Sequence, residues 1–382
     1  MNGAKIIFNG FFVIFMIILF ITAAGCTGKS GFSTENGSSL TTITDGYGRT
    51  VTIPVHPDRV ICSGAGCLRY IVYLGAQDRI VGVDSMETEP QTGEARSYAL
   101  ANPRFSSLPL IGTLGGKDDP EKMIGIGPQV IFKLGSPSDQ PGQVISAADT
   151  LQNKTGIPVI AMSAGSMYNP EEKAQMYATF RLMGRILGNE TRAEELITYI
   201  DTTSADLEQR TKDIPVSQQK TAYVGGVAYS GAHGIVSTEP AYPPFIWIHA
   251  KNIAAGSGPL HADISKETLV NADPEFLFID VATTKINGGG AIGELKANPA
   301  FANLSAVRSG GVYGVLPYNF YGTNYDTVLA DAYFIGKVMY PDRFADIDPS
   351  VKAAEIYAKF VGKPVFITII ANNPLGFQKI PV

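Results

Sequence analysis

Short apolar runs alternate with longer stretches of helical spacing along most of the chain. The runs are four to six residues long, which is typical of buried strands. The predicted strands lie at 59–62, 80–83, 130–134 and 159–162 in the first half, and at 222–227, 276–281 and 311–316 in the second. Strands that alternate with helices favour parallel pairing. The pattern therefore predicts an α/β fold with two lobes, each with a central, mostly parallel sheet flanked by helices.

One short module occurs twice, once in each half. Residues 120–135 read PEKMIGIGPQVIFKLG, and residues 265–281 read SKETLVNADPEFLFIDV. In each copy a glutamate, Glu121 or Glu267, is followed seven positions later by a proline and then by an apolar run. Because proline stops a helix, each module predicts a short acidic helix that leads into a buried strand. The equal spacing predicts that two similar lobes present a carboxylate at matching places.

The segment at 190–212 contains no glycine or proline and carries apolar residues on one helical face. At about 1.5 Å per residue, such a helix would be roughly 35 Å long, which is enough to cross from one lobe to the other. A β-hairpin is expected at 41–53, and an extra strand within the apolar tail at 364–382. The predicted organisation is an N-terminal lobe at 41–189, a connecting helix at 190–213 and a C-terminal lobe at 214–382.

The chain begins with a targeting segment. Lys5 precedes an apolar stretch at 11–21, and small residues then lead to Cys26. This order is typical of a lipoprotein signal, in which the peptide is cut before a cysteine whose thiol carries lipid. We expect a signal peptide at 1–25, lipidation of Cys26 and a flexible tether at 26–40, so that the folded part is anchored to the outer face of the cell membrane. The alternatives are an ordinary signal peptide or an uncleaved anchor helix, and both also export the chain.

Composition and motifs exclude several classes of function. The formal net charge is −5, the hydrophobic content is 45% and no basic stripe appears, so a folded protein without a nucleic-acid partner is expected. The sequence has no nucleophile elbow, zinc-protease motif or phosphate-binding loop, and an enzyme is therefore not expected. The four histidines are scattered, which argues against a metal site. Cys62 and Cys67 are interpreted as either a local disulfide or two small buried residues.

Glycine, polar and aromatic residues follow several of the predicted strands. Because α/β sheets bind ligands at the carboxyl ends of their strands, these loops form the candidate ligand site. Glycine allows close approach to the backbone, cations can meet an anionic ligand, and Tyr or Trp rings suit a bulky, partly polar one. The alternative for each residue is an ordinary surface charge or a core ring. The candidates are Ser63, Gly64, Ala65, Gly66, Arg69, Lys133 and Ser136 in the first lobe, and Tyr229, Trp247, Tyr318 and Tyr321 in the second.

Four features follow one another in order: TDGYGRTVTIPVHPDRVIC at 44–62, the Glu121 module, the helix at 190–212 and the Glu267 module. Together they resemble the substrate-binding proteins of ABC importers for iron-siderophore, haem and cobalamin, in which a rigid helix links two lobes. The resemblance covers roughly residues 41–362. It implies that Glu121 and Glu267 dock onto arginines of a permease dimer, which works with its ATPase. It also implies a monomer without a cofactor that binds its ligand in the cleft between the lobes.

The resemblance and the Tyr-rich loops favour a metal chelate as the ligand, with a ferric siderophore as the first choice. A corrinoid such as cobalamin, or haem, is the alternative ligand within the same class. An exported tetrapyrrole-handling enzyme is the alternative from another class, because related two-lobed architectures also host catalysis.

Overall fold

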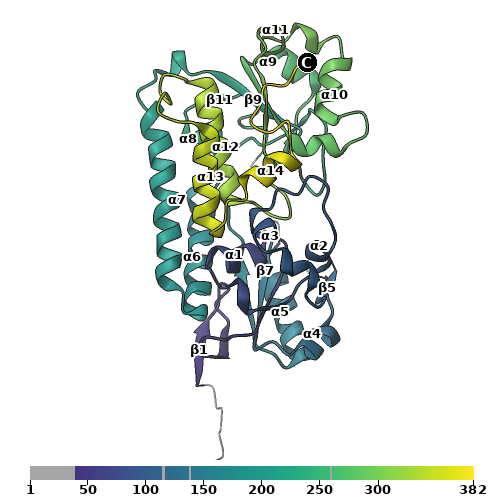
Figure 1. The fold of residues 1–382 in the computed structure, drawn as a ribbon, viewed down its shortest axis with the longest axis vertical. Coiled ribbons are helices and arrows are strands. Elements are labelled where there is room, and N and C mark those ends of the chain that lie inside the picture. The colour runs from purple at the N-terminus through teal and green to yellow at the C-terminus, as the bar shows by residue number, and fades with distance from the viewer. Residues whose placement is uncertain (1–38, 114–116, 137–138, 259) are drawn as a thin grey trace, which may run out of the picture. The chain divides into compact units, whose positions relative to one another are not determined.

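The computed structural model describes residues 39–382 with gaps at 114–116, 137–138 and 259. Residues from Ser39 onward form one compact unit, shown in Figure 1. The predicted signal peptide, the lipidation site at Cys26 and most of the tether lie outside the described residues. Within the described part, no helix combines the length and the apolar character that a membrane span requires.

The first lobe is built around a four-stranded parallel sheet. Its order is β4-β3-β7-β8, and its strands are β3 (Val60–Ser63), β4 (Ile80–Gly82), β7 (Val130–Gly135) and β8 (Val159–Ser163). The strand β3 is buried along its whole length, as expected of a parallel strand with helices over the sheet. The helices of this lobe include α1 (Cys67–Tyr73), α4 (Pro120–Ile126), α5 (Pro141–Thr155) and α6 (Pro170–Leu187).

The second lobe repeats the same strand order. Its sheet is β11-β9-β13-β14, again parallel throughout, with β9 (Thr221–Gly225), β11 (Lys251–Asn252), β13 (Phe276–Asp280) and β14 (Val312–Val315). In each lobe the first strand lies between the second and the third, and the fourth lies outside the third. The predicted fold class, with two α/β lobes, is confirmed. The surrounding helices are α8 (Pro243–Trp247), α9 (Lys266–Ala272), α10 (Gly290–Ala297), α11 (Ser305–Ser309), α12 (Tyr325–Met339) and α13 (Pro349–Val361).

The helix α7 (Glu190–Thr211) links the lobes, as the sequence predicts, and it is continuous. Figure 1 shows it as the long helix beside α6, α8 and α12, and it contacts all three. Its start is tied to the first lobe, because Asn189 Nδ2 donates to the carbonyl of Leu74 at 2.7 Å. Its end is tied to the second lobe through Thr211 Oγ1, which lies 2.9 Å from His249 Nδ1. A continuous helix has no loop hinge, so large domain closure is not expected.

The hairpin is confirmed as β1 (Leu40–Thr44) paired with β2 (Thr50–Pro54). The extra strand predicted at 364–382 is wrong for most of that segment. Its first part is the helix α14 (Phe366–Asn372), and only Lys379 forms an isolated bridge, with Tyr313. Phe366 and Ile369 are both buried at helical spacing. The smaller elements are α2 (Ser85–Thr88), α3 (Ser97–Ala101), β5 (Gly112–Thr113), β6 (Lys117–Asp118), β10 (Ser237–Thr238) and β12 (Ala262–Asp263).

A disulfide joins Cys62, in β3, to Cys67, the first residue of α1. Of the two interpretations that the sequence leaves open, the structure has the disulfide. The bond closes the four-residue turn Ser63–Gly66 between a strand and a helix. The first of the candidate ligand loops is therefore held covalently at both ends.

Candidate functional site

The candidate loops of the two lobes meet at an interlobe seam, formed by Ser63–Gly66 and Arg69 on one side and Tyr318–Asn324 on the other. Arg69 is 1% exposed, and its Nη2 donates to the carbonyl of Tyr321 at 3.1 Å. The backbones are equally close, because a Cβ atom added to Gly322 would lie 3.2 Å from the carbonyl oxygen of Ala65. The loops that the sequence assigns to ligand binding thus contact each other directly.

Cations from both lobes converge on one aromatic ring of the seam. Lys285, which follows β13, places Nζ 3.8 Å from the ring centroid of Phe320. Arg96 of the first lobe places Cζ 5.4 Å from the same centroid. Burial lowers the pKa of Lys285, although the nearby carboxylate of Asp280 opposes this shift. Two cationic side chains close to one ring make cation–π contacts that hold the two lobes together at this point.

Acidic side chains fix this cluster. Arg96 forms ion pairs with Glu87 at 3.0 Å and with Glu94 at 2.5 Å. Across the seam, the hydroxyl of Tyr321 donates to the carboxylate of Asp84, which follows β4. Burial raises the pKa of Asp84, and the Tyr321 hydrogen bond opposes that shift. Arg96 is therefore oriented by two carboxylates, and Tyr321 by a third.

A second polar cluster lies in the first lobe, beside the loop Ser63–Gly66. Lys133 Nζ is 2.5 Å from Asp118 Oδ2 and 3.1 Å from Ser63 Oγ. The hydroxyl of Ser63 in turn donates to Asp118 Oδ1 at 2.5 Å. The side chains of Asp118 and Lys133 are each 12% exposed. The structure thus brings together two predicted ligand residues, Ser63 and Lys133, through a carboxylate that the sequence analysis did not single out.

A third cluster crosses between the lobes at Glu239. This residue is 1% exposed, and its Oε2 accepts a hydrogen bond from Tyr318 at 2.5 Å and a longer one, at 3.4 Å, from Tyr168 of the first lobe. Its Oε1 has no hydrogen-bond partner among the described residues. Burial raises the pKa of Glu239 to about 7, although the two tyrosine hydroxyls oppose this shift. The carboxyl group therefore changes its charge near neutral pH.

The remaining predicted ligand residues have different surroundings. Tyr318 is fully buried and Trp247 is 6% exposed, so both rings pack in the core. Tyr229 is 44% exposed and stacks on His261, with ring centroids 4.4 Å apart. Ser136 is exposed, and its backbone amide donates to Asp139 Oδ2 at 2.8 Å. Only some of the predicted set therefore offers surface to a ligand in this conformation.

The repeated modules fold alike. Asp119 and Ser265 are the N-caps of α4 and α9, and each accepts a hydrogen bond from the amide three residues later. Glu121 and Glu267 are the second residues of these helices, and both are exposed. Each helix ends in a left-handed residue before the buried proline and the third strand of its sheet. The two carboxylates therefore stand at equivalent positions of two equivalent units.

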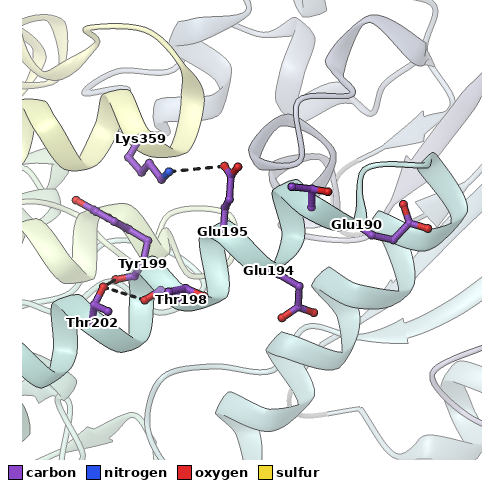
Figure 2. A pocket seen from close by; sticks show the side chains of 8 residues that line it. Glu190, Glu194, Glu195, Thr198, Tyr199, Thr202 and Lys359 are labelled. Carbon is purple, nitrogen blue, oxygen red and sulfur yellow. Dashed lines mark hydrogen bonds and ion pairs between the residues drawn. The ribbon is translucent and has the colours of Figure 1, made fainter.

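One cavity lies on α7, and another lies beside the cluster of Ser63, Asp118 and Lys133. The cavity on α7 is shallow, with a volume of about 770 Å³, and is drawn in Figure 2, where Lys359 reaches Glu195 at 3.7 Å. Glu190, Glu194 and Thr198 belong to the same lining. The other, of about 590 Å³, lies between α4 and α5, with Asp118 and Lys133 in its wall. Among the described residues, no three His, Cys, Asp or Glu side chains are grouped so that they could hold a metal ion.

Several residues of the site were missed from the sequence. Asp84 directly follows a predicted strand, and its position could have drawn attention to it. Arg96, Glu239 and Lys285 lie in segments without regular pattern, and no periodic signal marks them. Asp118 lies beside a repeated module but has no acidic counterpart in the other copy.

Comparison with known proteins gives a consistent picture. Residues 60–317 match the family described as periplasmic binding protein. Among curated proteins, the molybdate-binding protein MolA of Haemophilus influenzae is 23% identical over 83% of this chain and 90% of its own length. The iron(3+)-hydroxamate-binding protein FhuD of Bacillus subtilis is 22% identical over 82% of this chain and 91% of its own.

Solved structures share the fold. Molybdate-bound MolA superposes with a TM-score of 0.65 at 19% identity, covering 85% of this chain and 98% of that one. The TroA-like protein FepB of Veillonella parvula gives 0.60 at 21% identity, covering 84% and 96%. The haem-binding protein HutB of Vibrio cholerae gives 0.54 at 18% identity, covering 74% and 99%.

Proposed function

The chain belongs to the periplasmic binding protein family, and we propose that it is the extracytoplasmic substrate-binding protein of an ABC importer. It acts as a monomer, captures a small ligand between its lobes and delivers it to a permease dimer with its ATPase. It is not an enzyme on this proposal, because binding and docking are the whole mechanism. The docking contacts are Glu121 and Glu267, whose equivalent positions in α4 and α9 suit a two-fold symmetric partner.

The ligand we propose is an anionic metal chelate, with a ferric siderophore as the first choice. The observation that carries this choice is the position of Lys285 over the ring of Phe320, because charge and aromatic area lie together at the meeting point of the lobes. Arg96 contacts the same ring but is already paired with Glu87 and Glu94. Exposed Tyr229 adds a further flat surface in the second lobe. The similarity to an iron(3+)-hydroxamate-binding protein supports a ferric siderophore, although not its negative charge.

A compact metal oxyanion is the second candidate. Two observations favour it: the loops of the seam already touch, which suits a small ligand better than a large one, and cations lie beside them. The similarity to molybdate-binding MolA agrees with this reading. Cobalamin, another corrinoid or haem is the remaining alternative. The cations of the seam give a neutral corrinoid no support, whereas the propionates of haem could meet a cation.

Isothermal titration of the purified protein separates these ligands. A ferric hydroxamate, a ferric catecholate, ferric citrate and sodium molybdate would be added in parallel, with apo-siderophore and sulfate as controls. Saturable binding of a ferric chelate supports the first choice. No binding heat with any of the three chelates, together with saturable binding of molybdate, would favour the metal oxyanion as the ligand. Visible absorption of the protein as purified would reveal a corrinoid or haem.

The anchor is a separate proposal. A signal peptide ending at residue 25 and a lipidated Cys26 would tether the protein to the outer face of the membrane, and the relative YvrC of Bacillus subtilis is named as a lipoprotein. Cys26→Ser should move the protein from the membrane fraction to the soluble one. Retention of the variant in the membrane would favour an uncleaved anchor helix instead.

A further inference from the structure

The triangle of Ser63, Asp118 and Lys133 joins a ligand loop to a docking helix. Asp118 accepts from Ser63 through one carboxylate oxygen and pairs with Lys133 through the other, both at 2.5 Å. The next residue, Asp119, is the N-cap of α4, and Glu121 follows two positions later. The path from the proposed docking carboxylate to the ligand loop is therefore three residues of backbone and one hydrogen bond.

The loop end of this path is rigid. Gly64 has φ of +102°, and a Cβ atom placed on it would lie 2.3 Å from the carbonyl oxygen of Leu134 in β7. The loop thus packs closely against the end of β7, the strand that carries Lys133. The disulfide between Cys62 and Cys67 joins the two residues that flank the loop. A displacement of Ser63 must therefore move Gly64–Gly66, which contact the second lobe at Gly322.

The second lobe lacks this connection although its module is otherwise equivalent. The modules are aligned by their N-caps, Asp119 and Ser265, so the counterpart of Asp118 is Ile264 and that of Lys133 is Ile279. Strand register gives the third counterpart: Ser63 pairs with Lys133, and Gly225 pairs with Ile279. Both isoleucines are buried, and none of the three side chains carries a polar atom.

We propose that Asp118 is a positioning residue that couples the docking helix α4 to the ligand loop Ser63–Gly66, and that this coupling exists in the first lobe only. The inference rests on the proposed function, because only that function makes α4 a helix that docks onto a permease. A permease that binds both lobes symmetrically would then act on the ligand loop from one side, through α4. The device needs no hinge, because a tilt of α4 moves Asp118 and the hydrogen bonds it makes.

Coupling between two sites is reciprocal, so the proposal can be tested without ligand or permease. Hydrogen exchange of backbone amides would be followed in the purified protein. Ser63→Ala removes one hydroxyl at the loop and should accelerate exchange in α4, about tenfold for the loss of a hydrogen bond to a carboxylate. Asp118→Asn should accelerate exchange in Ser63–Gly66 by a similar factor. Exchange in α9 should stay unchanged in both variants.

Asp119→Asn is the matched control. It makes the same change of charge one residue along the chain, and it retains an N-cap residue. Among the contacts that the structure describes, none is a side-chain hydrogen bond or ion pair between Asp119 and the triangle, so exchange in the ligand loop should not change. The proposal is overturned if Ser63→Ala leaves α4 unaffected, or if Asp119→Asn loosens the loop as much as Asp118→Asn does.

A second arm adds the cognate permease in lipid nanodiscs. Docking of the wild-type protein should change exchange at Ser63–Gly66, and docking of Asp118→Asn should leave it unchanged. If wild-type protein does not dock at all, the proposed function fails, and the first arm still decides whether α4 and the loop are coupled. If both proteins dock and respond alike, the coupling role of Asp118 is wrong.

Discussion

Arg69 of the first lobe places Nε 3.2 Å from the Oδ1 of Asn324 in the second. The amide group of the same asparagine donates to the carbonyls of Tyr318 and Phe320, at 3.0 and 3.2 Å. Asn324 therefore shapes the loop of its own lobe and also presents that loop to Arg69. The pair Arg69–Asn324 thus links the conformation of the loop Tyr318–Asn324 to the contact between the lobes.

Replacement of Arg69 should loosen this loop. Arg69→Ala leaves buried carbonyls and the Asn324 oxygen without a donor, which we expect to lower the free energy of unfolding by about 1–3 kcal/mol. Denaturant titration measures the loss, and hydrogen exchange should show it at residues 318–324. Arg79→Ala is the control, because the hydrogen bonds described for Arg79 go to carbonyls of Pro57 and Leu187, both in the first lobe. Equal exchange at 318–324 in both variants would contradict the interpretation.

Stability should depend on pH through Glu239. Its pKa is raised by burial to about 7, above the usual value near 4.5, so the folded state binds the proton more tightly than the unfolded one. The contribution of Glu239 to the free energy of unfolding should therefore be complete below about pH 4.5 and be lost as the pH rises toward 7, by at most about 3 kcal/mol. Chemical denaturation at several pH values measures this fall.

The variant Glu239→Gln identifies the group responsible. The groups facing Glu239 are the hydroxyls of Tyr168, Tyr318 and Tyr242 and the carboxylate of Glu172. Burial also raises the pKa of Asp280 to about 7, so this residue makes stability fall in the same pH range. Its contribution should persist in Glu239→Gln. We expect Glu239→Gln to flatten part of the pH dependence and Asp280→Asn to flatten another part. An unchanged profile in Glu239→Gln would refute the assignment.

The tight approach of Gly64 to β7 should make this position intolerant of a side chain. Gly64→Ala would place a methyl group against the carbonyl of Leu134 at positive φ, at a cost of about 1–3 kcal/mol of unfolding free energy. Gly142→Ala is the matched control. Gly142 has open space around its Cβ position, and alanine favours the helix α5, so this variant should be neutral or more stable. Thermal unfolding compares them, and a stable Gly64→Ala variant would contradict the described loop.

Charge reversal tests docking. Glu121→Lys and Glu267→Lys should each weaken import, and the double variant should abolish it, because the two contacts bind one symmetric partner. Ligand binding by the isolated protein should survive, since both residues are exposed and neither belongs to the seam. Glu171→Lys is the control, because Glu171 is also exposed and follows a proline at the start of a helix, α6. Normal import by the double variant would end the docking proposal.

The sequence predicted what depends on local pattern. The seven core strands, the connecting helix and the paired modules are confirmed, because apolar runs, helical spacing and proline stops act over a few residues. The tail was misread, because an apolar run such as FITII can form either a strand or a helix until its packing partner is known. The helix α5 was not predicted, since its apolar face is narrow and only three of its residues are buried.

The seam was harder to predict. Arg69 was expected to meet a ligand, and its burial against Asn324 depends on a segment about 250 residues away in the chain. Tyr318 looked like a ligand ring, and its environment depends on Glu239, which lies in a region without periodicity. Contacts between lobes combine distant segments, so no local pattern encodes them.

The disulfide also has a consequence for how the protein matures. Cys67 is fully buried and Cys62 nearly so, which leaves little sulfur within reach of an oxidant once α1 has packed against the sheet. The thiols must therefore meet while the first lobe is still assembling. If the chain completed its folding under reducing conditions, both thiols would be buried before they could be oxidised, and the disulfide would not form. Oxidation and packing of this lobe are thus ordered events.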